Sequence, residues 1–304
     1  MNAFQPGLVH LPVTPFTRDR RIDFDRLGRL IDFHIRNGAD ALALPTHAGE
    51  SVSLTDGEKR MLIEFAVKHI AGRKPLIAHV SDAGTAIAAA LARHAEAAGA
   101  DAILVTTPYY WTPPPEMILE HFVEIGAAVR LPFLVHNAPE DMSGAKVSAE
   151  LMLKLIRRLD NFAGLVDASL DWQFMIDLIM EARHARPGFL LISGTELMVS
   201  AAAIGATGMF APLAGVAPNL LRALFELCRD DKLFEARAAQ EEIARLRQLL
   251  KAGGVASLKA ALAARGRDCG QPRPPLQALD RHAADALARH LDSIAALRDE
   301  PRGW

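Results

Sequence analysis

Short apolar runs alternate with longer amphipathic stretches along most of the chain. The runs are brief and almost continuously hydrophobic, which favours strands buried on both faces of a parallel sheet. The strands are expected at residues 8–13, 41–44, 76–79, 102–105, 133–136, 163–166, 189–192 and 208–211. The stretches between them have helical periodicity, at residues 25–36, 55–71, 85–98, 115–129, 148–159, 171–182, 196–204 and 218–227.

This alternation predicts an α/β fold, a (β/α)8 TIM barrel, because right-handed crossovers wind parallel strands until the eighth can pair with the first. The segments that follow, at 230–250, 254–266 and 282–297, are predicted helices with no strands between them. We therefore expect the barrel in residues 1–225 and a C-terminal helical region packed on it in residues 226–304. Thr55, followed three residues later by Glu58, predicts a capping box at the start of one barrel helix.

Composition narrows the classes of partner. Half of the 304 residues are hydrophobic and the net charge is only -2, so the chain has material for a large core and no positive field for nucleic acid or an anionic membrane. We expect a small-molecule substrate. Cys228 and Cys269 are too few and too far apart for a disulfide framework or a CxxC-type zinc site. No signal peptide and no long apolar run is evident, which predicts a cytoplasmic protein.

Candidate chemistry lies just after the predicted strands, because the carboxyl ends of barrel strands form the active site. Residues 45–51 follow the second strand, and their glycine-containing turn either cradles a carboxylate or phosphate with backbone N–H groups or is a plain loop. Residues 107–115 follow the fourth strand and contain Tyr109 and Tyr110 among several prolines. A tyrosine fixed in a stiff loop is suited to donate or relay a proton.

Seven short motifs carry a resemblance to a known family. They are Val-Thr-Pro-Phe at 13–16, Ala-Gly-Glu-Ser at 48–51, Thr-Pro-Tyr-Tyr at 107–110, His-Asn-Ala-Pro at 136–139, Ile-Ser-Gly at 192–194, Gly-Ala-Thr-Gly at 205–208 and Arg-Pro-Pro-Leu at 273–276. In this order and spacing the chain resembles the pyruvate-dependent class I aldolases, which include dihydrodipicolinate synthase and N-acetylneuraminate lyase. The resemblance implies a (β/α)8 barrel with a C-terminal helical bundle, assembled as a homotetramer that is a dimer of dimers.

The resemblance fails at the residue on which the family's chemistry depends. The family places a lysine at the end of the sixth strand, where its amine forms a Schiff base with pyruvate. Here the segment is Gly164-Leu165-Val166-Asp167, so Val166 stands at the lysine position. A valine can neither form an imine nor accept a proton, which excludes the standard covalent chemistry at this position.

Other departures fall at positions that the resemblance places in the pocket. His136 replaces the tyrosine proton relay and can still exchange a proton near neutral pH. Asp141 replaces the arginine that grips the second substrate, and His47 and Ala48 replace two hydroxyl residues while leaving backbone donors. We therefore expect His136 and Tyr110 to be catalytic. The expected substrate-binding residues are His47, Ala48, Gly49, Glu50, Asp141, Val166 and Gly194.

The sequence predicts no cofactor, with one alternative. His47, His79 and His136 end or follow predicted strands, and three imidazoles could hold a divalent metal that replaces the imine as a Lewis acid. The other interpretation, that these histidines fill space and bond to neighbouring loops, is favoured.

Two functions are consistent with this sequence. The first is a lyase of aldolase or hydratase type that acts on a small oxo-acid or sugar-acid-like substrate without a lysine Schiff base; ordinary dihydrodipicolinate synthesis is not expected. The second is a noncatalytic descendant that keeps the pocket as a ligand sensor or scaffold.

Overall fold

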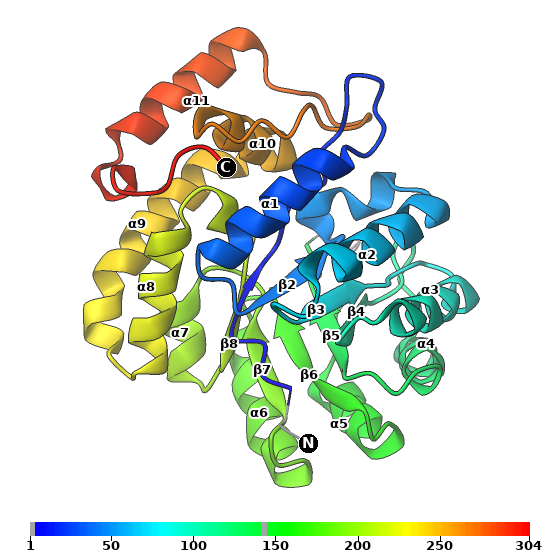
Figure 1. The fold of residues 1–304 in the computed structure, drawn as a ribbon. Helices are drawn as coiled ribbons and strands as arrows, with labels where there is room; N and C mark the ends of the chain where they lie inside the picture. Colours follow the sequence, from blue (N-terminus) through cyan, green and yellow to red (C-terminus); the bar gives the residue numbers. More distant parts are fainter. Residues whose placement is uncertain (1–3, 141–144) are drawn as a thin grey trace.

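The computed structural model describes residues 4–140 and 145–304. Within these residues, eight parallel strands form a closed barrel in chain order, and β1 pairs with β8 to complete it (Figure 1). The strands are β1 (Leu8–His10), β2 (Ala41–Leu44), β3 (Leu76–His79), β4 (Ala102–Thr106), β5 (Phe133–Asn137), β6 (Phe162–Asp167), β7 (Leu190–Ser193) and β8 (Gly208–Ala211). The predicted (β/α)8 barrel is confirmed.

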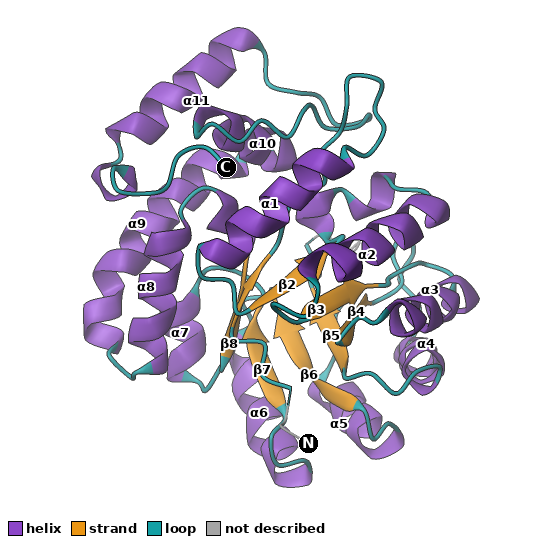
Figure 2. Cartoon of the chain, viewed as in Figure 1, coloured by secondary structure: helices purple, strands orange, loops and turns teal. Residues whose placement is uncertain are grey.

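Helices surround the barrel, as Figure 2 shows. They are α1 (Phe24–Arg36), α2 (Asp56–Ile70), α3 (Thr85–Ala98), α4 (Pro115–Ala127), α5 (Ala149–Arg158), α6 (Trp172–Ala185), α7 (Met198–Ala203) and α8 (Pro218–Arg229). The C-terminal region adds α9 (Leu233–Lys251), α10 (Gly254–Ala264) and α11 (Arg281–Ser293). The predicted domain boundary at residue 225 falls inside α8, which runs on to Arg229.

Local sequence explains where several elements begin and end. The first strand is shorter than the predicted 8–13, since Pro12 has no N–H to donate to a sheet ladder. Thr55 and Glu58 form the expected capping box at the start of α2. The α3 helix ends at Gly99, whose φ of 96° is the left-handed conformation that glycine adopts without steric cost.

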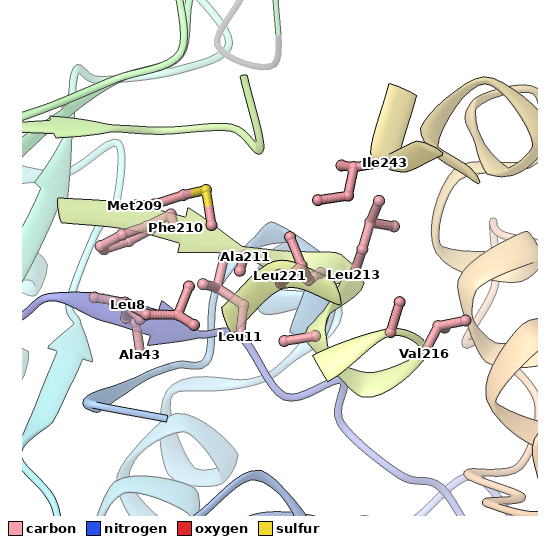
Figure 3. Close-up of a cluster of buried hydrophobic side chains, with 14 of the residues drawn as sticks. Leu8, Leu11, Ala43, Met209, Phe210, Ala211, Leu213, Val216, Leu221 and Ile243 are labelled. Carbon is pink, nitrogen blue, oxygen red and sulfur yellow. The ribbon is translucent and has the colours of Figure 1, made fainter. Parts of the chain in front are cut away.

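Alternate strand residues divide between two cores. Leu104 and Val166 belong to the cluster that includes the barrel interior, whereas Val105 and Leu165 pack between the strands and the outer helices. The first cluster extends beyond the barrel. Figure 3 shows side chains of β1, β2 and β8 with those of the C-terminal region, and Ile243 of α9 belongs to the same cluster. The helices after the barrel are therefore packed on it.

Two buried arginines bind carbonyl groups of the C-terminal segment. Arg265 donates to the carbonyls of Leu297 and Glu300, both at 2.8 Å. Arg267 is fully buried and donates to the carbonyls of Gly215, Pro301 and Gly303 at 2.6 to 3.1 Å. These bonds satisfy guanidinium donors that would otherwise be buried without acceptors. In the described part of the chain, no helix is both long and apolar enough to cross a membrane.

Candidate active site

The carboxyl ends of the strands are here called the barrel mouth. At this end, the register of β4, β5 and β6 places one residue of each strand side by side. Thr106 of β4 is opposite His136 of β5, and His136 is opposite Val166 of β6. His136 is partly buried, and its ring centroid lies 6.2 Å from that of Phe210. Thr106 and Val166 are almost completely buried. The proton-handling candidate therefore lies between a hydroxyl and an apolar side chain.

Val166 is fully buried and belongs to the same cluster as Leu134 and Ile192. Because Leu165 belongs to the outer cluster, the pleat places Val166 on the barrel side of the strand. A lysine at this position would reach into the barrel mouth. The valine instead offers no nucleophile and no proton acceptor.

His79 is already committed to structural hydrogen bonds. Its Nε2 lies 2.9 Å from the Ser81 hydroxyl oxygen, and its ring also bonds to the Pro45 carbonyl. Burial is the main cause that lowers the pKa of His79 to about 3, so the ring is neutral. The Ser81 hydroxyl in turn accepts from the backbone N–H of Thr106 at 2.8 Å. His79 therefore ties together the ends of β2, β3 and β4.

The three-histidine metal alternative finds no support in this geometry. Within residues 4–140 and 145–304, no three His, Cys, Asp or Glu side chains come together as a metal site requires. His47 is exposed, whereas His79 is buried with its ring bonded to neighbours. The described residues therefore do not form a metal site at these three histidines.

The loop after β2 forms a tight 3₁₀ turn, His47–Gly49. Within the turn, the N–H groups of Gly49 and Ser51 donate to the Thr46 carbonyl, and that of Glu50 donates to the His47 carbonyl. The N–H groups of His47 and Ala48 have no acceptor among the described residues. This pair is therefore the part of the predicted cradle that is free to hold a carboxylate.

The Glu50 carboxylate binds two residues of the C-terminal region. Its φ of 57° is left-handed, and its carboxylate pairs with the Lys259 ammonium at 2.6 Å. The other carboxylate oxygen accepts from the backbone N–H of Arg273 at 2.7 Å. Glu50, which the sequence predicts to bind substrate, therefore uses its carboxylate in a buried ion pair. The position of Lys259 on a predicted helix did not indicate this partner.

The tyrosine loop presents its two tyrosines differently. Tyr110 is 93% exposed and has a φ of 85°, and Trp111 beside it is 50% exposed. Tyr109 is half-buried, and burial together with the Asp82 carboxylate raises the pKa of its phenol. Within a single chain, Tyr110 lies in solvent.

The ends of β5, β6 and β7 form a rigid corner. Asn137 and Ser169 donate to the Asp167 carboxylate at 2.6 and 2.7 Å, and burial raises the pKa of this carboxyl. The N–H of Gly194 donates to the Asp167 carbonyl at 2.7 Å. A Cβ on Gly194 would approach the Ala168 nitrogen to 2.8 Å, so this position requires glycine. Asp141 lies outside the described residues.

Sequence reasoning missed several polar groups near the mouth. Lys59 of α2 is buried, with its ammonium 3.7 Å from the Asp82 carboxylate, and its charge contributes to the low pKa of His79. The hydroxyls of Thr46 and Thr106 are buried without a hydrogen-bond partner in the described structure. The one signal in the sequence for Thr106 was its position directly after the predicted strand 102–105.

Comparison with known proteins identifies a family model and relatives that match most of the chain. Residues 5–294 match the model of the dihydrodipicolinate synthetase family. A 4-hydroxy-tetrahydrodipicolinate synthase of Bacillus subtilis (strain 168) is 30% identical, over 93% of this chain and 97% of its own. One of Azoarcus sp. (strain BH72) is 38% identical, over 79% of this chain and 80% of its own.

Solved structures agree with the sequence relatives. A putative dihydrodipicolinate synthetase from Pseudomonas aeruginosa has a TM-score of 0.90 and 31% identity, covering 97% of this chain and all of that one. YagE, a prophage protein of this family from E. coli K12 solved in complex with pyruvate, has a TM-score of 0.89 and 25% identity, covering 95% and 98% of the two chains. The family is of the lyase and aldolase class, and the chain belongs to the dihydrodipicolinate synthetase family.

Proposed function

We propose that this protein is a lyase of aldolase or hydratase type that acts on a small 2-oxo acid or sugar-acid-like substrate without a lysine Schiff base. The observation that carries the proposal is the pairing of His136 with Val166 at the barrel mouth. The position that would hold the amine is apolar, while the neighbouring position keeps a group able to exchange protons.

His136 would act as general base and acid. It takes a proton from the carbon next to the keto group, which leaves an enolate whose charge must be stabilised. The free N–H groups of His47 and Ala48 suit the substrate carboxylate, and the unpartnered Thr106 hydroxyl is a donor for oxygen. In the addition direction the enolate attacks a carbonyl carbon, and the protonated His136 returns its proton to the new alkoxide.

Further features of the proposal follow from the sequence. The reaction would need no cofactor and would run in a cytoplasmic homotetramer built as a dimer of dimers. Tyr110 would serve as a second proton-handling residue once a neighbouring subunit covers it, because its 93% exposure leaves it solvated in one chain.

A noncatalytic ligand-binding or scaffold role is the second candidate. Its specific support is the loss of the nucleophile at Val166, because a protein that only binds its ligand needs no amine there. It predicts ligand binding without turnover.

Deuterium incorporation separates the two candidates. The protein is incubated with pyruvate in D2O, and loss of the methyl signal is followed by proton NMR. The lyase proposal expects exchange that depends on His136 and disappears in His136→Ala. Binding of pyruvate without exchange would favour the noncatalytic role, and undiminished exchange in His136→Ala would overturn the acid–base assignment.

A further inference from the structure

We propose that Lys259 of α10 is a positioning residue for the barrel mouth: its ion pair with Glu50 holds the turn that presents the free N–H groups of His47 and Ala48. The role of these N–H groups in binding carboxylate rests on the proposed function, whereas the control of the turn by Lys259 does not.

The ion pair is short and sealed from water. The Lys259 nitrogen lies 2.6 Å from a Glu50 oxygen, and the two side chains are 2% and 0% exposed. The ammonium also lies 4.3 Å from the centre of the Phe16 ring and 3.4 Å from the Gln271 carbonyl oxygen. Burial lowers the pKa of Lys259, and the Glu50 carboxylate opposes that shift. Among residues 4–140 and 145–304, Lys259 is the one cation that forms an ion pair with the Glu50 carboxylate.

A shift of the Glu50 backbone would move the 3₁₀ turn His47–Gly49 that precedes it. It separates the 3₁₀ turns His47–Gly49 and Ser51–Ser53, and its left-handed backbone is one that a non-glycine residue keeps only when its surroundings impose it. The Thr14 hydroxyl donates to the Gly49 carbonyl at 2.6 Å on the other side. Without the ammonium, Glu50 would be a buried carboxylate lacking its main counter-charge, so it would protonate or leave its site.

The C-terminal region therefore helps to hold the turn after β2 in place. The α10 helix supplies the ammonium, and the following segment supplies the Arg273 N–H that binds the second Glu50 oxygen. Arg273 also pairs with Glu58 in the capping box of α2. Residues after the barrel thus hold the connection between β2 and α2 at Glu50, near its middle, and at Glu58, in the first turn of α2.

Hydrogen exchange tests the positioning role without any assay of turnover. In Lys259→Met, the amides of Gly49, Glu50 and Ser51 should exchange at least about ten-fold faster than in the unchanged protein, since local opening sets their exchange rate. Lys251→Met changes an exposed lysine of α9 and is the matched control, expected to leave these amides unchanged. Unaltered exchange at these amides in a folded Lys259→Met protein would overturn the proposal.

Chemical rescue provides a second, independent measurement. A cavity of about 990 Å³ is lined by Lys259 together with Ala260 and Leu279. In Lys259→Ala, added ethylammonium can enter this space and restore the positive charge, so protection of the turn should return, while ethanol should have no effect. Equal effects of ethylammonium and ethanol would contradict a role for the charge. If Lys259→Ala does not fold, Lys259→Arg, which keeps the charge, should fold and retain protection; failure of both would assign Lys259 to the core alone.

The functional consequence is measured separately. If the protein deuterates pyruvate, Lys259→Met should raise the pyruvate KM about ten-fold with a smaller change in kcat, as expected for lost binding rather than lost chemistry. An unchanged KM beside faster amide exchange would show that the turn does not bind the carboxylate. Absence of deuteration in the unchanged protein would count against the proposed function and leave the exchange result standing.

Discussion

Val166 and His136 lie opposite each other in the parallel ladder between β5 and β6, at the carboxyl ends of the strands. The family resemblance places a proton relay at residue 136 and an imine-forming lysine at residue 166, side by side. The acid–base position retains a titratable group, while the imine position has none. The chemistry that we propose for this site therefore proceeds through an enolate that is not covalently bound to the protein.

We expect no pyruvate adduct after treatment with borohydride. The reagent traps an imine by reducing it, and Val166 provides no amine to form one. Intact-protein mass spectrometry after incubation with pyruvate and borohydride should give the unmodified mass. An adduct would contradict this expectation, and peptide mapping would then test Lys59, a buried lysine near His79.

Val166→Lys should introduce the missing amine. Desolvation in the barrel should lower the pKa of this amine and leave part of it neutral and nucleophilic. Some pyruvate adduct at residue 166 is expected in the same mass assay, with Val105→Lys, on the outer side of the neighbouring strand β4, as a control that should form none. A folded Val166→Lys protein without adduct would show that residue 166 does not meet the substrate.

His136→Ala should abolish turnover and leave the fold intact. Loss of a general base lowers the rate by about a hundred-fold to ten-thousand-fold, and the ring is only partly buried, so we expect a small change in melting temperature. His184→Ala, at an exposed position of α6, is the control for both readouts. Early melting combined with normal turnover would identify His136 as a packing residue.

The chain should assemble as a homotetramer. Tyr110 and Trp111 are 93% and 50% exposed on a proline-rich loop, and such aromatic surface is usually covered by a partner. Light scattering should give about four times the 32.9 kDa of one chain. Tyr110→Ser combined with Trp111→Ser should reduce this mass, whereas a monomer at micromolar concentration in the unchanged protein would contradict the assembly.

Stability should fall as the solution becomes acidic. Burial lowers the pKa of His34 and of His79 to about 3, so both rings are neutral when folded and take up a proton more readily when unfolded. The stabilisation is therefore complete above the unfolded pKa near 6.5 and is lost as pH decreases from there toward 3. Each such histidine should cost roughly 2 kcal/mol between pH 7 and pH 5.

Urea unfolding at several pH values measures this effect. His34→Gln removes one of the titrating rings and should flatten the dependence of the unfolding free energy on pH. His184→Gln, at an exposed site, should leave that dependence as it is. A dependence that is identical in His34→Gln would show that His34 is not a neutral buried group.

The sequence predicted the barrel well because its determinants are local. Apolar runs and a capping box at Thr55 place strands and helices, and the position of Val166 follows from its neighbours along β6. The candidate site was less predictable because its contacts are not local. Lys259 reaches Glu50 only after the helices beyond the barrel fold back onto it, and no sequence pattern gives that approach.

His79 illustrates the same limit. From its position at the end of a strand it was a candidate metal ligand, yet its ring bonds to Ser81 and to the Pro45 carbonyl. The second of these partners comes from another strand end. Which atoms satisfy a buried imidazole depends on the closure of the barrel, and the residues beside it in sequence do not determine that.

The bonds from Arg265 and Arg267 to residues 297–303 affect the order in which the chain can mature during translation. A nascent chain can close the barrel once β8 has left the ribosome. When Arg265 and Arg267 follow, the Gly215 carbonyl is already available to Arg267, but the carbonyl acceptors in residues 297–303 have not yet emerged. The fold is complete only after the ribosome has released residue 303. Until then, a barrel with an unfinished C-terminal region is the species that chaperones and proteases would meet.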